Sequence, residues 1–187
     1  MNLKKFGTLF FSTALVGILL GLLMALTQQF NVNIMFGVIT GGFLSATAMM
    51  GFWGYLMLNF AMRSFISFRL WVIFQALLIA LVYFDLVYFR FMFTSEGQGS
   101  IWPYVGYATW PLVLAAVFAY MKARLSGMRS FIPALFFLFV FTTLEWFIAL
   151  KSGAVLQMTV IGIILLGCNA FMLMMYTRLL NKPSTAK

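Results

Sequence analysis

The chain has 187 residues, which is the length of one domain, and 64% of them are hydrophobic whereas only 8% are charged. A water-soluble domain carries about 25% charged residues, so this composition excludes an ordinary soluble protein and predicts one that is solvated by lipid. The net charge of +9 does not indicate nucleic-acid binding, because the cations stand at the ends of apolar segments, where they suit lipid headgroups and membrane topology.

Six apolar runs are each about 20 residues long, the length at which a helix crosses the hydrocarbon core of a bilayer. A backbone in lipid must satisfy its own hydrogen bonds, which favours helices over isolated strands. We therefore predict an all-α polytopic membrane protein, a six-transmembrane-helix bundle that forms a single integral membrane domain over residues 1–187, with the first run retained as a span. The predicted spans are Phe6–Leu26, Ile34–Phe60, Leu70–Phe93, Tyr104–Met121, Phe131–Leu150 and Ala154–Tyr176.

The cations are distributed unevenly between the two sides of this predicted bundle. Arg90 and Lys151 stand on one side, and all the other Lys and Arg residues stand on the opposite side. The positive-inside rule places the richer side in the cytoplasm. The sequence therefore predicts a multi-pass protein of the cell membrane with both termini in the cytoplasm. The richer side holds Lys4, Lys5, Arg63, Arg69, Lys122, Arg124, Arg129, Arg178, Lys182 and Lys187.

Small residues repeat every four positions in the first two predicted spans. Residues four apart share one face of a helix, and small side chains let two helix backbones approach closely. Two interpretations are open, namely packing within the bundle and a docking face for the membrane helix of a partner. The candidate face comprises Gly17, Gly21 and Ala25 in the first span and Gly37, Gly41 and Ser45 in the second.

Ionisable residues inside predicted spans are costly in lipid and usually face the interior of a bundle. Asp85 in the third span and Glu145 in the fifth both lie roughly 21–22 Å from the cytoplasmic start of their helices. Arg90 and Lys151 follow five and six residues later, so we predict that these four residues form one polar cluster near the outer surface. An ion-pair clasp that fixes helix register, a signal- or ligand-sensing site and a proton relay are its possible roles.

A second polar layer is predicted nearer the cytoplasmic side, where the same depth count places Asn59, Gln75 and Asn169. Side chains of this kind commonly join membrane helices by hydrogen bonds. The layer is therefore interpreted as structural.

The sequence holds few groups that are capable of catalysis. It contains no histidine, which removes His-based acid–base chemistry and most zinc sites. It has neither the P-loop pattern nor the G-x-S-x-G elbow, and its single cysteine, Cys168, lies in an apolar run. We predict a protein that is not an enzyme and needs no cofactor or metal, which leaves regulation, binding or transport.

Several polar motifs within the apolar sequence point to one family. They are Phe10-Phe11-Ser12-Thr13, Phe84-Asp85-Leu86-Val87-Tyr88-Phe89-Arg90, Ile101-Trp102-Pro103-Tyr104, Phe131-Ile132-Pro133-Ala134-Leu135-Phe136-Phe137 with Glu145-Trp146, and Cys168-Asn169-Ala170. With these motifs, spread over most of its length, the chain resembles the KbaA family, the KinB-signalling pathway activation proteins of spore-forming bacteria.

The resemblance implies an accessory membrane protein that promotes the activity of a sensor histidine kinase in the initiation of sporulation. The expected partners are membrane lipids and a membrane-embedded sensor histidine kinase, and the family supplies no catalytic residues to transfer. Two transport functions stay open beside it. Six spans in a short chain also resemble the substrate-binding subunit of a vitamin-type importer, and Asp85 and Glu145 suit a small ion- or proton-coupled transporter.

Overall fold

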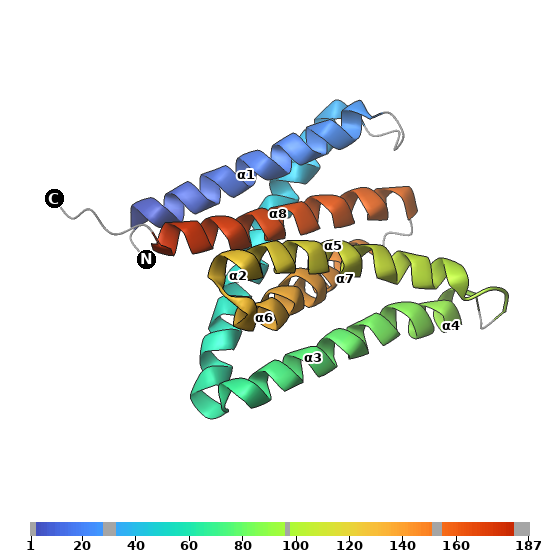
Figure 1. The fold of residues 1–187 in the computed structure, drawn as a ribbon. Coiled ribbons are helices and arrows are strands. Elements are labelled where there is room, and N and C mark those ends of the chain that lie inside the picture. The colour runs from blue at the N-terminus through green and yellow to red at the C-terminus, as the bar shows by residue number, and fades with distance from the viewer. Residues whose placement is uncertain (1–2, 28–32, 96–97, 151–154, 182–187) are drawn as a thin grey trace. The chain divides into compact units, whose positions relative to one another are not determined.

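The computed structural model describes residues 3–27, 33–95, 98–150 and 155–181 of the chain, and these residues are helical with no strand among them (Figure 1). The α-helices are α1 (Leu3–Leu26), α2 (Ile34–Phe65), α3 (Phe68–Phe84), α4 (Arg90–Ser95), α5 (Trp102–Ser126), α6 (Phe131–Phe136), α7 (Thr142–Leu150) and α8 (Val155–Asn181). Two π-helical turns, η1 (Asp85–Phe89) and η3 (Phe137–Phe141), and one 3-10 turn, η2 (Met128–Ser130), stand between them.

Six helical stretches within the described residues are long and apolar enough to cross a membrane. The all-helical prediction is confirmed, and the predicted spans agree with these stretches to within a few residues at most ends. The largest differences are of five residues. The α2 stretch was predicted to end at Phe60 but continues to Phe65, with Arg63 in its last turn, the α5 stretch continues from Met121 to Ser126, and the last stretch begins at Thr159 instead of Ala154. The stretches are Lys4–Leu26, Ile34–Phe65, Phe68–Met92, Trp102–Ser126, Met128–Trp146 and Thr159–Leu179.

The chain divides into two compact units. Unit 1 comprises Met1–Gly54 and Leu144–Lys187, and unit 2 comprises Tyr55–Thr143. The boundaries fall inside α2 and α7, so each of these helices contributes one part to each unit. The single integral membrane domain expected from the sequence stays a prediction.

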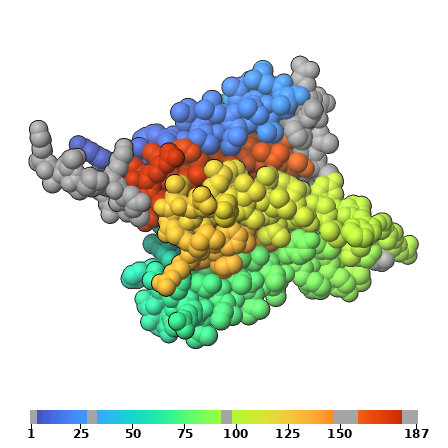
Figure 2. Space-filling model, in the orientation of Figure 1, coloured from blue at the N-terminus to red at the C-terminus, as the bar shows by residue number. Residues whose placement is uncertain are grey.

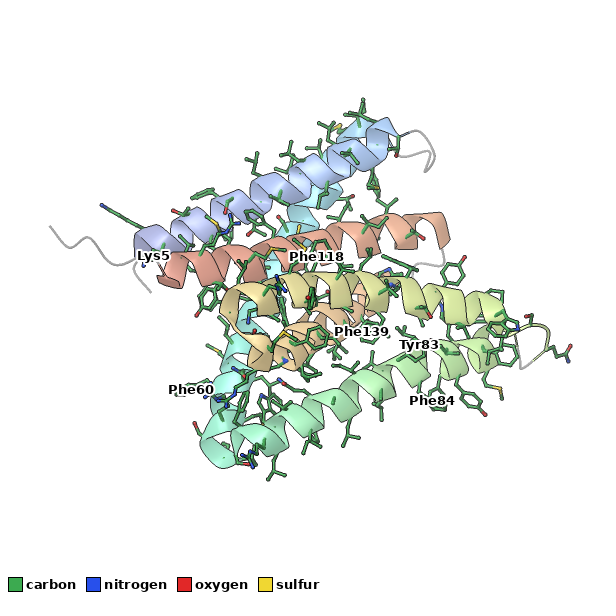
Figure 3. The ribbon with its side chains drawn as sticks, viewed as in Figure 1. Lys5, Phe60, Tyr83, Phe84, Phe118 and Phe139 are labelled. Carbon is green, nitrogen blue, oxygen red and sulfur yellow. The ribbon has the colours of Figure 1, made fainter. Side chains whose placement is uncertain are left out.

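In unit 1, α1 and α8 run side by side in opposite directions, α1 in blue and α8 in red (Figures 1 and 2). The amine of Lys5, at the start of α1, donates to the carbonyl oxygen of Leu179 near the end of α8 at 2.8 Å (Figure 3). Further along the pair, Gly167 of α8 faces the side chain of Leu20. These contacts join the first two-thirds of α1 to the second half of α8.

The helices α1 and α2 of unit 1 approach each other backbone to backbone. Gly17 lies against the carbonyl of Gly41, and Gly21 lies against that of Gly37. All six residues of the candidate docking face, including Ala25 and Ser45, are buried. The two small-residue stripes thus pack on each other, and a partner's helix would reach them only if α1 and α2 separated.

Unit 2 is built around large aromatic side chains. The ring of Tyr55 from α2 lies 4.9 Å from that of Phe137, and the ring of Trp71 from α3 lies 6.0 Å from that of Phe136. Phe136 also lies 5.9 Å from Phe141, at the end of η3. These contacts hold α2, α3 and the α6–η3 segment together.

The helix α5 of unit 2 buries small residues instead. Ala108, Ala115, Ala119 and Ala123 are almost completely buried at intervals of one or two turns, and α5 packs against α6 and η3. The helix α5 also runs antiparallel to the α3–η1–α4 segment, because the hydroxyl groups of Tyr83 in α3 and Thr109 are 3.0 Å apart and the rings of Phe91 in α4 and Tyr104 lie 5.7 Å apart.

Candidate functional site

The carboxyl group of Glu145 is the centre of the candidate site, which lies within unit 1. The amide nitrogen Nδ2 of Asn169 in α8 donates to Oε2 of Glu145 in α7 at 3.0 Å, and Asn169 has no exposed surface. The second carboxyl oxygen, Oε1, is buried and has no hydrogen-bond partner among the described residues. An acceptor in this position is costly, because a buried polar atom without a partner loses its hydration and gains nothing in return.

Gly51 of α2 forms the wall of the site. A Cβ atom added to Gly51 would collide with Oε1 and Cδ of Glu145, so the carboxyl group occupies the space that a side chain at position 51 would need. The site therefore joins three helices of unit 1, with the carboxyl group on α7, its donor on α8 and a glycine on α2. Gly51 could not be singled out from the sequence, since glycine is common in membrane helices.

The neighbour of Asn169 in the sequence extends the site towards α1. Cys168 is fully buried, and its Sγ lies 3.2 Å from the position of a Cβ atom added to Gly17. Cys168 is a free thiol in an apolar setting, where cysteine behaves as a small hydrophobic residue. It fills the space between α8 and the glycine stripe of α1.

The four residues of the predicted outer cluster fall in different parts of the chain. Asp85, which is half-buried, opens η1 and Arg90 begins α4, so both belong to unit 2, whereas Glu145 belongs to unit 1. Lys151 lies outside the described residues. The guanidinium carbon of Arg90 lies 5.7 Å from the ring centre of Tyr107, a cation–π distance. The four-residue cluster stays a prediction.

The predicted cytoplasmic polar layer is contradicted at one member, Asn169, and stays a prediction for Asn59 and Gln75. Asn169 bonds to Glu145, a residue assigned to the opposite half of the bundle, and Asn59 accepts a 2.8 Å hydrogen bond from Nε1 of Trp71. The depth of Asn169 was counted from a helix end at Tyr176, whereas α8 continues to Asn181. Counted from Asn181, Asn169 lies roughly 18 Å along the helix, close to the depth of Glu145.

Gln75, the remaining member of that layer, is fully buried, and neither polar atom of its amide has a hydrogen-bond partner in the described structure. It stands one turn after Trp71 on α3, and these two are the buried residues of that helix. Tyr55 of the same unit is better satisfied, because its hydroxyl group donates to the carbonyl oxygen of Pro133 at 3.2 Å.

The site offers one buried carboxyl group and one amide, and its chemistry is limited to hydrogen bonding, proton binding or attraction of a cation. Among the described residues no three His, Cys, Asp or Glu side chains stand close enough together to hold a metal ion. The arrangement therefore suits control of helix packing more than bond-making chemistry.

Comparison with known proteins decides the family. Residues 8–179 match the KbaA family, described as KinB-signalling pathway activation in sporulation. The chain belongs to this family. The matched region contains Gly51, Glu145 and Asn169, and the resemblance inferred from the sequence motifs is confirmed.

A curated relative carries the same description. The chain is 34% identical over 143 residues to the KinB-signaling pathway activation protein of Bacillus subtilis (strain 168), and the match covers 76% of this chain and 72% of the relative. No solved structure matches the chain.

Proposed function

We propose that this member of the KbaA family is an integral membrane accessory protein that promotes the activity of a sensor histidine kinase at the initiation of sporulation. Family membership carries the proposal, because the family and the Bacillus subtilis relative are both named for activation of the KinB-signalling pathway. The proposed activity is regulatory and involves no catalytic step by this chain.

The exposed surface supports a location in the membrane. Large apolar side chains are exposed on the long helices α1, α2, α3 and α5, among them Phe60 at 78%, which points away from α2 (Figure 3). A soluble monomer rarely exposes extended apolar surface, whereas a lipid-facing helix does so by necessity. The uneven distribution of cations supports the proposed orientation, with both termini in the cytoplasm.

Kinase activation needs only a difference in affinity. A protein that binds the active conformation of a kinase more tightly than the inactive one shifts the population towards the active form. For a tenfold shift the difference is about 1.4 kcal/mol, which a few helix contacts in lipid supply. No pocket or reactive group is required for this mechanism.

We propose further that Glu145, Asn169 and Gly51 form a hydrogen-bonded clasp that fixes the register of α7 against α2 and α8. The carboxyl group of Glu145 accepts one hydrogen bond from Asn169 and lies directly against Gly51. Only one arrangement of these helices keeps both contacts. The clasp would keep the kinase-binding surface in one conformation. A proton-coupled transporter is the alternative that the same buried carboxyl group favours.

The test of the proposed function is deletion of the gene in its host, with sporulation efficiency measured with and without a complementing copy. A defect in initiation that the copy restores supports kinase activation, and purified kinase reconstituted with the protein should then autophosphorylate faster. Normal sporulation would contradict the proposal and direct attention to flux in liposomes and to bound small molecules.

The clasp is tested by complementation with Glu145 variants at equal membrane abundance. Glu145→Gln keeps an acceptor for Asn169 and should retain most activity, whereas Glu145→Leu removes the acceptor and should lose it. Leu144→Ala is the matched control, because Leu144 precedes Glu145 and is 57% exposed. Full activity of Glu145→Leu would refute the clasp, and a Gln variant as inactive as Leu would favour proton binding.

A further inference from the structure

Two turns of unit 2 carry a concentration of positive charge at one end of the unit. Arg63 and Arg69 flank the turn between α2 and α3, and Arg124 and Arg129 flank the turn between α5 and α6. The fifth cation is Lys122, a half-buried residue in the last turns of α5. Because α3 and α5 are antiparallel, the start of α3 and the end of α5 lie at the same end of unit 2.

Within the described part of unit 2, no acidic side chain is close enough along the chain to neutralise these cations. In the sequence of unit 2 the acidic residues are Asp85 and Glu96. Asp85 stands roughly 24 Å along the helix from Arg69, and Glu96 lies outside the described residues. The charge at this end is therefore available to a negatively charged ligand.

Local contacts position the arginine side chains. The guanidinium carbon of Arg63 lies 5.5 Å from the ring centre of Phe68, and that of Arg124 lies 6.0 Å from the ring centre of Tyr120. A guanidinium group stacked on a ring keeps its N–H edge free to form two hydrogen bonds with one oxyanion. The turn beside Arg129 is fixed by Ser130, whose hydroxyl group donates to the carbonyl oxygen of Gly127 at 2.7 Å.

Apolar side chains are exposed among the arginines. Phe65, Leu70, Leu125 and Met128 all stand within a few residues of a guanidinium group, and each is more than half exposed. A cationic surface interleaved with large apolar groups suits the boundary between headgroups and acyl chains. An acidic peptide in water would leave the apolar side chains unmatched, so the surface favours a lipid over a protein segment.

We propose that the two turns, with Arg63, Arg69, Lys122, Arg124 and Arg129, form a binding site for the phosphate groups of anionic phospholipids. The guanidinium edges bind the phosphate oxygens while the acyl chains lie along the exposed apolar side chains. This lipid binding does not depend on the proposed kinase activation. It gives unit 2 a preference for anionic over neutral lipids.

Native mass spectrometry of the full-length protein in mild detergent tests the site, with phosphatidylglycerol as the probe and phosphatidylcholine as the neutral comparison. The wild-type protein should bind phosphatidylglycerol about tenfold more tightly, since hydrogen bonds between charged groups supply a difference of this size. Added salt should weaken this preference. Equal affinity for the two lipids would overturn the proposal without any variant.

Matched variants locate the site on the protein. Arg124→Gln with Arg129→Gln should remove most of the preference, and the two Lys replacements should keep part of it, because lysine retains the charge but not the planar fork. Lys4→Gln with Arg178→Gln removes two exposed cations from unit 1 and should leave the preference intact. Helix content by circular dichroism checks folding. Equal loss in both double variants, or tighter binding of a polyglutamate peptide than of phosphatidylglycerol, would overturn it.

Discussion

In unit 1 the backbones of α1 and α2 meet at glycines, whereas in unit 2 large aromatic rings fill the space between α2, α3 and the α6–η3 segment. Lipid solvates apolar side chains as well as a protein interior does, so in both units helix association depends on close packing and hydrogen bonds. In unit 1 the helices pack closely because glycines at the contact have no side chain. In unit 2 they pack closely because large aromatic side chains interlock. The two units should therefore respond in opposite ways to added and removed volume.

The largest expected effect is a truncation in unit 2. Phe136 is 2% exposed and contacts the rings of Tyr55, Trp71 and Phe141. Phe136→Ala should lower the free energy of unfolding by about 3 kcal/mol, because it leaves a cavity that the surrounding rigid rings cannot fill. Unfolding by a denaturing detergent measures the change. Phe60→Ala removes an equal volume from an exposed position, and a similar loss there would contradict an aromatic core.

A methyl group added at the glycine contact should destabilise unit 1. A Cβ atom at position 21 would meet the carbonyl oxygen and carbon of Gly37, so Gly21→Ala should cost about 2 kcal/mol by forcing α1 and α2 apart. A Cβ atom at position 42 would meet the side chain of Ile18 at 3.7 Å, an ordinary contact, which makes Gly42→Ala the control. If both variants unfold alike, the close backbone approach is refuted.

The two smallest expected effects have opposite signs and sharpen the comparison within unit 2. Gln75→Leu replaces a fully buried amide without hydrogen bonds by an apolar side chain, and should raise the free energy of unfolding by about 1 kcal/mol. Asn59→Leu removes the acceptor for Trp71 Nε1 and should lower it by about 0.6 kcal/mol. Destabilisation by Gln75→Leu would mean that the amide has a partner in the membrane.

The site residues were found in the sequence to different extents. Glu145 stood out because an acidic residue inside an apolar run is rare, and Asn169 was noted as a polar residue of the last span. Their contact was not predicted, because the depth count from the predicted end of the last span assigned Asn169 to another layer than Glu145. Gly51 and the alanines of α5 gave no signal, since small residues are frequent in membrane helices and their partners depend on how the helices are rotated.

The helices, the family and the distribution of charge could be predicted without the structure, because they depend on local apolar runs, motifs and the order of residues along the chain. Which face of each helix meets which neighbour was decided only by the tertiary structure. The composition offers no amphipathic signal for this choice, since lipid accepts an apolar face as readily as another helix does. The pairing of Gly21 with Gly37, of Glu145 with Asn169 and of Trp71 with Asn59 therefore depends on close packing that no single helix encodes.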